Sequence, residues 1–384
     1  MPTLSYKYRL YPNRGQVSDL NGMLGAFCDL YNACLQQRIE AYQRRAISLN
    51  YYDQAAELRA IREADERLAG FSFTAQQQVM RRVEKTFKAF FGRMKKKKAK
   101  AGFPRFKAKD RYHAAEFRVG DGLSVKKNGR IAITGVAGEI KVRRHRPLPA
   151  GAKLGQAILT RQAGHWYVVF QATFPEVYGP QPFRGDVGVD VGLASLAALT
   201  TGETVPAPQW TKRAAKSLRR HQRAVARCRR GSSNRRKAKQ RLARFTARIA
   251  NRRRDALHKL SRDLVNRFSH IAFEDLGIAA LARTMLAKSI HNAAWGQLIS
   301  FTAYKAANAG GFVAKVNPRG TSQECDCCGR VTPKTLNERI HDCPGCGTVE
   351  DRDIHAAKVI KHRAFPWSKG LGASLEASSQ RVAA

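Results

Sequence analysis

The stretch Val187-Gly188-Val189-Asp190-Val191-Gly192 decides the fold of the second half of this 384-residue chain. It is an apolar run that holds a single carboxylate, which predicts a buried strand. A second stretch, His270-Ile271-Ala272-Phe273-Glu274, has the same character and ends on an acid. Burying an unpaired carboxylate is costly. The two stretches therefore predict that their acids have a function.

A third acid, Asp353, stands directly before the helix-forming run Ile354-His355-Ala356-Ala357. Taken singly, Asp353 could cap that helix, and Glu274 could pair with a nearby arginine. Taken together, Asp190, Glu274 and Asp353 suit a hard divalent cation, because two carboxylates about 4 Å apart repel by roughly 4 kcal/mol at an effective dielectric constant of 20. Two Mg²⁺ ions held in this way can activate a water and stabilise the leaving oxygen of a phosphodiester.

Five of the eight cysteines crowd into the segments Cys325-Asp326-Cys327-Cys328-Gly329 and Cys343-Pro344-Gly345-Cys346-Gly347. Two C-x-x-C-G turns supply four thiolates in the arrangement that suits tetrahedral zinc, and the glycines allow the turns. The symmetry selects Cys325, Cys328, Cys343 and Cys346 as zinc ligands and omits Cys327, although His341 could replace one ligand. A closed site of this kind is structural, so we assign it no catalysis.

The formal net charge of +41 predicts a polyanionic partner, because so basic a chain repels itself in a compact fold. Residues 93–109 hold nine basic residues and no acid, and residues 211–260 hold 20 Lys or Arg and one acid. The second segment carries apolar residues at spacings of three and four and is interrupted at residues 231–234. It predicts a helical hairpin with a basic outer face that could follow a phosphate backbone, so nucleic acid is the expected partner.

The remaining segments differ in their hydrophobic patterns. Residues 4–10 alternate like a half-buried strand, residues 17–91 have helical periodicity, and residues 115–174 consist of short β-branched and aromatic runs. Residues 365–384, rich in Ala, Ser and Gly, predict a disordered tail. We expect no membrane partner and a cytoplasmic location, because the sequence has no apolar run of 18 residues and no signal-peptide core at its start.

The order of these features resembles the TnpB (OrfB) family of insertion-sequence proteins, which is RuvC-like and related to type V CRISPR effectors. The resemblance extends over nearly the whole chain. The matching motifs are Tyr8-Arg9-Leu10-Tyr11-Pro12, Tyr31-Asn32, Gly102-Phe103-Pro104-Arg105-Phe106-Lys107, residues 188–192, Phe273-Glu274-Asp275-Leu276, Ala294-Trp295-Gly296, Tyr304-Lys305, Thr321-Ser322-Gln323 and Asp351-Arg352-Asp353.

The resemblance implies an α/β multidomain fold. A wedge-like, barrel-like β domain would comprise residues 1–14 and 100–182, and a helical recognition lobe residues 15–99. A RuvC/RNase H-like nuclease domain would comprise residues 183–318 and 350–364, with a zinc ribbon at 319–349 inserted into it.

The resemblance also implies a function, that of an RNA-guided DNA endonuclease encoded by a transposable element. One protein would bind one guide RNA from the transposon end, read a short motif beside a double-stranded DNA target, and cleave the DNA by two-metal hydrolysis. Asp190, Glu274 and Asp353 match the magnesium-binding acids of the family. Arg339 falls where some relatives carry an arginine beside the scissile phosphate.

One residue departs from the family pattern. His355 stands where the family commonly has asparagine, and it could donate a hydrogen bond, become protonated or contact metal. Two other functions stay open: a cleavage-silent, RNA-guided DNA-binding repressor and a basic zinc-ribbon RNA-binding protein. The three intact acids argue against the first, and the second leaves Asp190 and Glu274 unexplained. No separate strand-transfer chemistry is evident, so we do not expect the transposase that moves the element.

Overall fold

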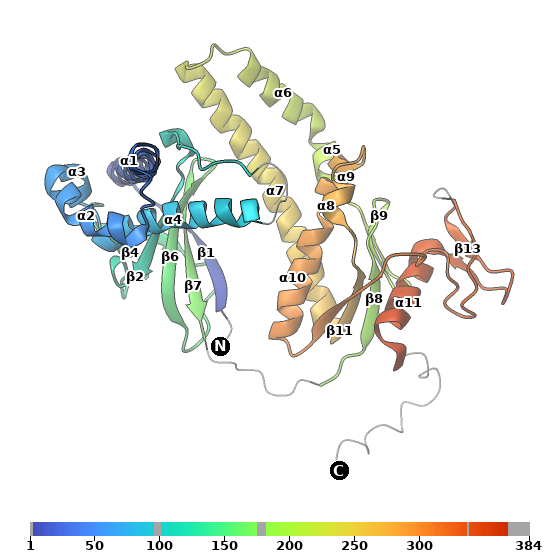
Figure 1. Ribbon diagram of the computed structural model, residues 1–384. Coiled ribbons are helices and arrows are strands. Elements are labelled where there is room, and N and C mark those ends of the chain that lie inside the picture. Colours follow the sequence, from blue (N-terminus) through green and yellow to red (C-terminus); the bar gives the residue numbers. More distant parts are fainter. Residues whose placement is uncertain (1–2, 96–100, 175–181, 336–337, 368–384) are drawn as a thin grey trace. The chain divides into compact units, whose positions relative to one another are not determined.

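The computed structural model describes residues 3–95, 101–174, 182–335 and 338–367 (Figure 1). The chain divides into two compact units, residues 1–176 and residues 177–384. Each unit has its own hydrophobic core.

A closed β-barrel forms the sheet of the first unit, with the strand order β1-β5-β4-β3-β2-β6-β7. The strand β1 pairs antiparallel with both β5 and β7, so the start of the chain closes a barrel built otherwise from later residues. This confirms the predicted β domain with an N-terminal strand. The strands are β1 (Thr3–Tyr11), β2 (Ala114–Val119), β3 (Gly122–Val125), β4 (Ile131–Ile133), β5 (Glu139–Arg143), β6 (Lys153–Gln162) and β7 (His165–Thr173).

The other regular elements in the described part of this unit are helices, joined by loops. They are α1 (Arg14–Arg45), α2 (Tyr51–Ala64), α3 (Glu66–Ala69) and α4 (Phe73–Lys95), with a 3-10 turn at Lys109–Arg111. Asn13 and Gln16 form a capping box that starts α1, and Asn50 and Asp53 form another that starts α2. The helical periodicity of residues 17–91 is thereby confirmed.

The second unit is built on a five-stranded sheet of order β10-β9-β8-β11-β12. Its strands are β8 (Asp186–Asp190), β9 (Ser195–Leu199), β10 (Thr204–Pro206), β11 (His270–Glu274) and β12 (Phe312–Val316). The strand β11 runs parallel to both β8 and β12, whereas β9 is antiparallel to β8. The two apolar stretches that end on acids are thus neighbouring parallel strands, and their carboxyl ends meet at one edge of the sheet.

The helices of the second unit are α5 (Trp210–Arg213), α6 (Ala215–Ala226), α7 (Ser233–Arg267), α8 (Ile278–Leu281), α9 (Ala287–Ala293), α10 (Trp295–Asn308) and α11 (Arg352–Ala364). The helical segment of residues 287–308 is broken into α9 and α10 at Ala294, which has the left-handed φ of 56°. A short ribbon, β13 (Ile340–Asp342) and β14 (Val349–Asp351), precedes α11.

The close contact between α11 and β8 depends on Gly188. A Cβ atom at this position would lie 2.0 Å from the carbonyl oxygen of Ala357 and 2.7 Å from the amide nitrogen of Lys361. Only glycine lets the backbones of the strand and the helix approach this far. Gly188 therefore brings the start of α11 to the edge of the sheet where the acidic strands end.

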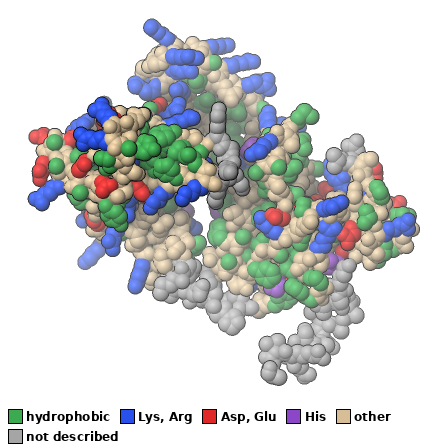
Figure 2. Space-filling view, in the orientation of Figure 1, with side chains coloured by type: hydrophobic (Ala, Val, Ile, Leu, Met, Phe, Trp, Pro, Cys, Tyr) green, Lys and Arg blue, Asp and Glu red, His purple; other side chains and the backbone are tan. Residues whose placement is uncertain are grey.

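The predicted basic hairpin is present as α6 and α7. Ser232 caps α7, and Lys and Arg side chains gather over both helices (Figure 2). An open groove of about 710 Å³ on α6 is lined by Lys216, Ser217, Arg219, Arg220, Arg223, Ala224 and Arg227. The apolar seam is buried only in the second half of α7, at Leu257, Leu264 and Val265 among others.

The end of the described chain packs on the sheet of the second unit. Phe365 is fully buried, and its ring lies 5.9 Å from that of Phe312. Ordered packing therefore includes residue 365, the first residue of the predicted tail, while residues 368–384 lie outside the described residues. Within the described residues, no helix is long and apolar enough to cross a membrane.

Candidate functional site

The three acids come from three elements of the second unit. Asp190 is the last residue of β8, Glu274 is the last residue of β11, and Asp353 is the second residue of α11. Because Phe273 pairs with Val189 in the parallel register, the next residue on each strand is an acid. The fold thus brings together carboxylates that lie 84 and 79 residues apart in the sequence.

Asp190 carries the strongest electrostatic effect of the three. Burial raises the pKa of its carboxyl group to about 7, and the nearby carboxylates of Glu274 and Asp353 add to the increase. The Arg352 guanidinium opposes this increase. A carboxyl group that is destabilised when ionised favours a cation that compensates its charge.

Glu274 is the most buried of the three acids, with 7% of its surface exposed. Burial raises the pKa of its carboxyl group, while a hydrogen bond from the Thr321 hydroxyl and the positive charge of Arg363 act against the increase. The Thr321 hydroxyl fixes one carboxylate oxygen of Glu274. The alternative of an arginine partner is met only through the charge of Arg363, which forms its own ion pair with Glu324, and no direct ion pair involves Glu274 among the described residues.

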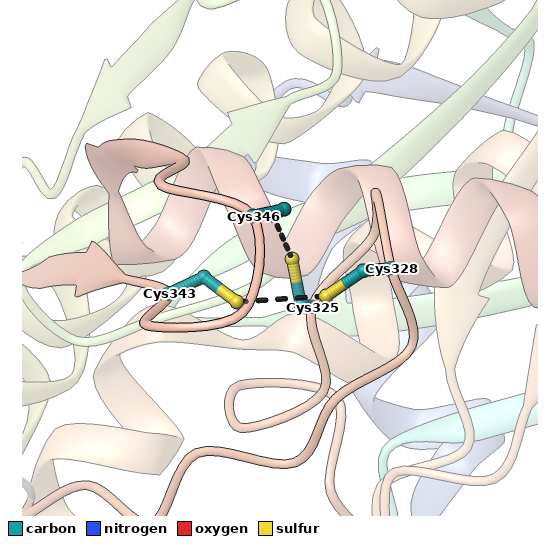
Figure 3. A group of neighbouring side chains, drawn as sticks. All are labelled: Cys325, Cys328, Cys343 and Cys346. Carbon is teal, nitrogen blue, oxygen red and sulfur yellow. Dashed lines mark hydrogen bonds between the residues drawn. The ribbon is translucent and has the colours of Figure 1, made fainter.

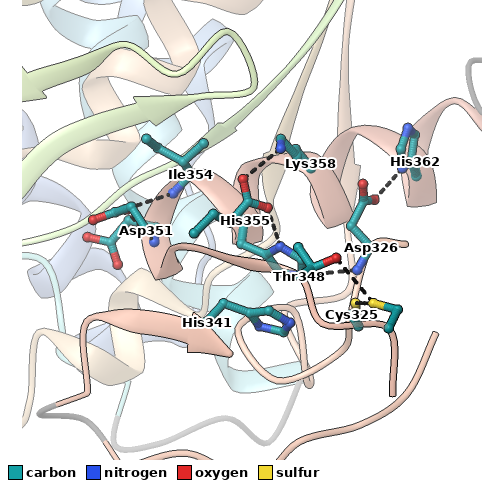
Figure 4. A network of polar contacts seen from close by, with 12 residues as sticks. Cys325, Asp326, His341, Thr348, Asp351, Ile354, His355, Lys358 and His362 are labelled. Carbon is teal, nitrogen blue, oxygen red and sulfur yellow. Dashed lines mark hydrogen bonds and ion pairs between the residues drawn. The ribbon is translucent and has the colours of Figure 1, made fainter. Parts of the chain in front are cut away.

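Asp353 is held by arginines and does not cap its helix. Asp351 is the N-cap of α11, and its side chain accepts hydrogen bonds from the amides of Asp353 and Ile354 (Figure 4). The carboxylate of Asp353 lies 3.1 Å from Nη2 of Arg352 and 3.6 Å from Nη1 of Arg339. The simple capping interpretation of Asp353 is therefore wrong, and the structure places Arg339 beside an acid.

The acids are not gathered as tightly as a loaded metal site. Among the described residues, the groups whose ligand atoms all lie within 4.8 Å of one another consist of cysteines and histidines. Repulsion between uncompensated carboxylates favours such a separation. Divalent cations would remove this repulsion, and oxygen donors of this kind are the ligands that Mg²⁺ prefers.

The four cysteines selected by their spacing form one cluster, and Cys327 is not part of it (Figure 3). The Sγ atoms of Cys325 and Cys346 are 3.6 Å apart, and so are those of Cys328 and Cys343. A tetrahedral zinc with bonds of about 2.3 Å separates its sulfurs by about 3.8 Å. Gly329 and Gly347 have φ values of 75° and 72°, as the turns after each second cysteine require. The donor set therefore fits zinc.

The thiols of the cluster differ in their surroundings. A backbone amide, that of Gly345, lowers the pKa of Cys343, and a hydrogen bond with Thr348 lowers the pKa of Cys346 to about 6. Burial raises the pKa of Cys325 to about 11. Cys325 is thus the ligand whose negative charge most needs support from its neighbours.

His355 points toward the cysteine ribbon, the segment of residues 319–351 that carries the four clustered cysteines. Its Nε2 accepts a hydrogen bond of 3.0 Å from the amide of Asp326, and its Nδ1 faces the carboxylate of Glu350. These two contacts occupy both ring nitrogens of His355. Of the roles considered for this residue, hydrogen bonding is therefore the one that the structure shows. His341 is fully buried and stacks on His355.

Two residues at the acids were not singled out as site residues by their chemistry in the sequence. Thr321 contacts Glu274 and Arg352 contacts Asp353. Both lie inside motifs that carry the family resemblance, Thr321-Ser322-Gln323 and Asp351-Arg352-Asp353. Their motifs were the available signal, because neither residue type is distinctive by itself.

The described geometry defines a class of protein. A mixed α/β sheet with acids at the carboxyl ends of adjacent strands and a cysteine ribbon before the last helix has the fold of Cas12f-type effectors. A solved Cas12f1–sgRNA–target DNA complex contains a chain that aligns with a TM-score of 0.57 and 14% identity, covering 91% of this chain and 83% of that one. This similarity concerns the fold alone.

Sequence comparison gives the particular family. A Streptomyces pristinaespiralis protein named "Putative RNA-guided DNA endonuclease" is 33% identical over 363 residues, covering 93% of this chain and 88% of that protein. An Escherichia coli K12 protein, "Putative RNA-guided DNA endonuclease InsQ", is 28% identical and covers 93% of this chain and 91% of that protein. The chain belongs to this TnpB (OrfB) family, as its sequence motifs predict.

Three family descriptions match successive parts of the chain. "Probable transposase" of the OrfB type matches residues 180–285, a Cas12f1-like TNB domain matches residues 295–360, and a helix-turn-helix domain matches residues 1–46. In the structure this last segment is the strand β1 followed by the single long helix α1. The helix-turn-helix label therefore does not describe the local fold.

Proposed function

We propose that this protein is an RNA-guided DNA endonuclease encoded by a transposable element. The observation that carries the proposal is the convergence of Asp190, Glu274 and Asp353 at one edge of the sheet, where ionisation of Asp190 is disfavoured without a cation. Relatives that align over most of their length are named as RNA-guided DNA endonucleases, which supports the same activity.

The three acids would hold two Mg²⁺ ions, which would activate a water and neutralise charge on the leaving 3′ oxygen of the DNA strand. Asp190 would release its proton to solvent when a cation binds, so that its carboxylate could serve as a ligand. The Thr321 hydroxyl orients Glu274, and Arg352 holds Asp353 in place. Arg339 has 54% of its side chain exposed next to Asp353, so it can turn from that acid to a phosphate of the DNA.

The basic surfaces would hold the nucleic acids. The hairpin of α6 and α7 offers a row of guanidinium groups, and each phosphate neutralised would contribute about 0.7 to 0.9 to the salt dependence of binding. We assign the wedge role to the barrel, guide and target recognition to α1–α4, and the nuclease role to the sheet of the second unit. The cysteine ribbon would hold one structural zinc ion.

Cleavage is tested with the protein purified together with its co-expressed RNA. Sequencing of that RNA should give one defined species that ends in a variable segment. A DNA target matching this segment, placed in a library of flanking sequences, should be cut only with Mg²⁺ and only beside a particular short motif. A target that does not match the guide is the control.

The variant Asp190→Asn separates cleavage from binding. It should bind the matched target as the parent does and give no product. Equal cutting by the parent and the variant would refute the assignment of Asp190. Tight, guide-dependent binding by the parent without product in Mg²⁺ or Mn²⁺ would instead establish a guided repressor. The mass of the purified complex tests the expected ratio of one protein to one RNA.

A further inference from the structure

His341 and His355 form a buried aromatic stack between the cysteine ribbon and α11. Their ring centroids are 3.5 Å apart and their planes differ by 14°. Both side chains are almost completely buried, with 0% and 1% of their surface exposed. Neither the proposed cleavage nor the four-cysteine metal site assigns a role to this pair.

One nitrogen of His341 has no hydrogen-bond partner among the described residues. The Lys334 ammonium contacts its Nδ1, and because an ammonium group only donates hydrogen bonds, Nδ1 must be the acceptor. The ring proton of neutral His341 is then on Nε2. This atom is buried and has no hydrogen-bond partner in the part of the chain that the structure describes. A buried N–H without an acceptor is costly, so the site lacks a group that would satisfy it.

The nearby thiol of Cys325 can be that group. A ring nitrogen of His341 and the Sγ of Cys325 belong to one cluster whose ligand atoms lie within 4.8 Å of one another. Cys325 is itself buried, with 1% of its surface exposed. A thiolate formed there on metal binding would gain from a donor close by, as metal ligands commonly do.

His341 and His355 do not suit direct coordination of a shared metal ion. Their rings are nearly parallel, so the in-plane lone pairs of their nitrogens do not converge on one point. His355 also uses Nε2 for the Asp326 amide and Nδ1 for Glu350. The four cysteines already complete a tetrahedral set.

We propose that His341 is a positioning residue of the zinc site: its Nε2–H donates to the Cys325 thiolate, and its stack on His355 links zinc occupancy to the start of α11. The inference rests on the proposed zinc ion. Lys334, His341 and Cys325 would then form a hydrogen-bonded chain in which the ammonium group polarises the imidazole toward the thiolate. His355 then connects this chain to the helix that carries Asp353, two residues away.

Several further polar contacts hold the cysteine ribbon and α11 together. On the same helix, Lys358 donates 2.6 Å to Glu350, His362 contacts Asp326, and Arg363 contacts Glu324. Figure 4 shows the His355, Lys358 and His362 contacts side by side along α11. Asp326 and Glu324 flank Cys325 in the sequence, so a change in the turn around the metal is passed directly to the helix.

The first test measures zinc release to a colorimetric chelator from the full-length protein with its RNA. His341→Phe keeps the shape and the stack but removes the N–H, and it should release zinc about tenfold faster than the parent. His341→Gln keeps a donor near the Nε2 position and should stay within about threefold of the parent. His291→Phe, at an exposed histidine of α9, is the control and should leave the rate unchanged.

The second test replaces zinc with Co²⁺ and records the visible spectrum. The parent and His341→Phe should both show the bands of four-sulfur coordination, with the sulfur-to-metal charge-transfer band displaced in the variant. A three-sulfur, one-nitrogen spectrum that His341→Phe abolishes would make His341 a ligand and overturn the proposal. Equal release rates for the parent and His341→Phe would also overturn the role of His341. If the parent still bound zinc in that experiment, the proposed zinc site would nevertheless stand. A parent without zinc would overturn both.

The link to α11 has its own readout. His355→Gln keeps an acceptor for the Asp326 amide, whereas His355→Asn keeps only the contact with Glu350. In zinc-loaded protein, His355→Asn should raise the Mg²⁺ concentration for half-maximal cleavage several-fold more than His355→Gln, with DNA binding unchanged. Equal Mg²⁺ requirements in the two variants would refute the link.

Discussion

Replacing Asp190 by asparagine should stabilise the second unit at alkaline pH, although it abolishes cleavage. The pKa of Asp190 is about 7 in the folded protein, against 3.8 for an ordinary aspartate. The difference of about 3 units corresponds to roughly 4 kcal/mol, at 1.36 kcal/mol per unit. This is an upper bound on what the ionised carboxylate costs the folded state in the absence of metal.

The sign of the pH dependence follows from the raised pKa. Between about pH 4 and pH 7 the folded protein keeps a proton on Asp190 that the unfolded chain releases, so the contribution of Asp190 to the free energy of unfolding of the parent falls as pH rises through this window. Asp190→Asn has no such proton to lose. The variant should therefore match the parent near pH 4 and exceed it in stability by up to about 4 kcal/mol at pH 8.

Urea unfolding without Mg²⁺ measures this difference, followed by tryptophan fluorescence. Three of the four tryptophans, Trp210, Trp295 and Trp367, belong to the second unit, and Nε1 of Trp295 donates to the carbonyl of Gly192 beside the acids. The control is Asp263→Asn, an exposed acid on α7 that should change stability by less than about 1 kcal/mol.

Mg²⁺ should reduce this difference in stability at pH 8. At a concentration one hundred times its dissociation constant, a ligand stabilises the folded state by about 2.7 kcal/mol, and the parent should gain this while Asp190→Asn gains much less. The reasoning would be refuted if the stabilities of the variant and the parent differed equally at pH 5 and pH 8, or if the variant's advantage shrank as pH rose from 5 to 8.

Three further predictions concern the surroundings of the acids. Gly188→Ala should destabilise the second unit by more than about 3 kcal/mol in urea unfolding, since the added Cβ would overlap Ala357. In the control Gly277→Ala, the added Cβ would have its nearest neighbour 3.9 Å away and should cost less than about 1 kcal/mol. Similar costs for the two variants would contradict the close packing of α11. Arg339→Gln should lower single-turnover cleavage at least tenfold and change the free energy of unfolding by less than about 1 kcal/mol, because its ion pair is exposed; an unchanged rate would assign it to the ribbon surface. Cys327→Ser should keep one zinc per chain by metal analysis, and Cys325→Ser should lose it; the opposite result would exchange their roles.

Local sequence patterns were enough to predict most elements of this fold. The alternation of residues 4–10, the helical periodicity of residues 17–91 and the apolar runs around Asp190 and Glu274 each express a physical preference that acts over a few residues. The paired C-x-x-C-G turns likewise predict the four cysteines that cluster in the structure, because the turn conformation is a local requirement. No strand was predicted at residues 195–206, where β9 and β10 form by pairing with each other and with β8.

The arrangement of the acids was decided by tertiary structure. Parallel pairing of β8 and β11 places Asp190 beside the end of the other strand, and the missing side chain of Gly188 lets α11 bring Asp353 close. The local sequence does not determine whether Asp353 caps its helix or whether Glu274 contacts a hydroxyl or an arginine. Both depend on which side chains the fold places next to these acids. The same holds for His355, whose two hydrogen-bond partners come from the ribbon.

The sequence by itself determined which residues are chemically exceptional: scarce carboxylates in apolar strands, closely spaced thiols, and a basic excess concentrated in one hairpin. Those properties depend on residue type and short spacing. Only the tertiary structure decided which of them meet, because burial, electrostatic repulsion and hydrogen-bond satisfaction act between groups that are close in space and far apart along the chain. The raised pKa of Asp190 and the unpartnered Nε2 of His341 are both effects of that kind.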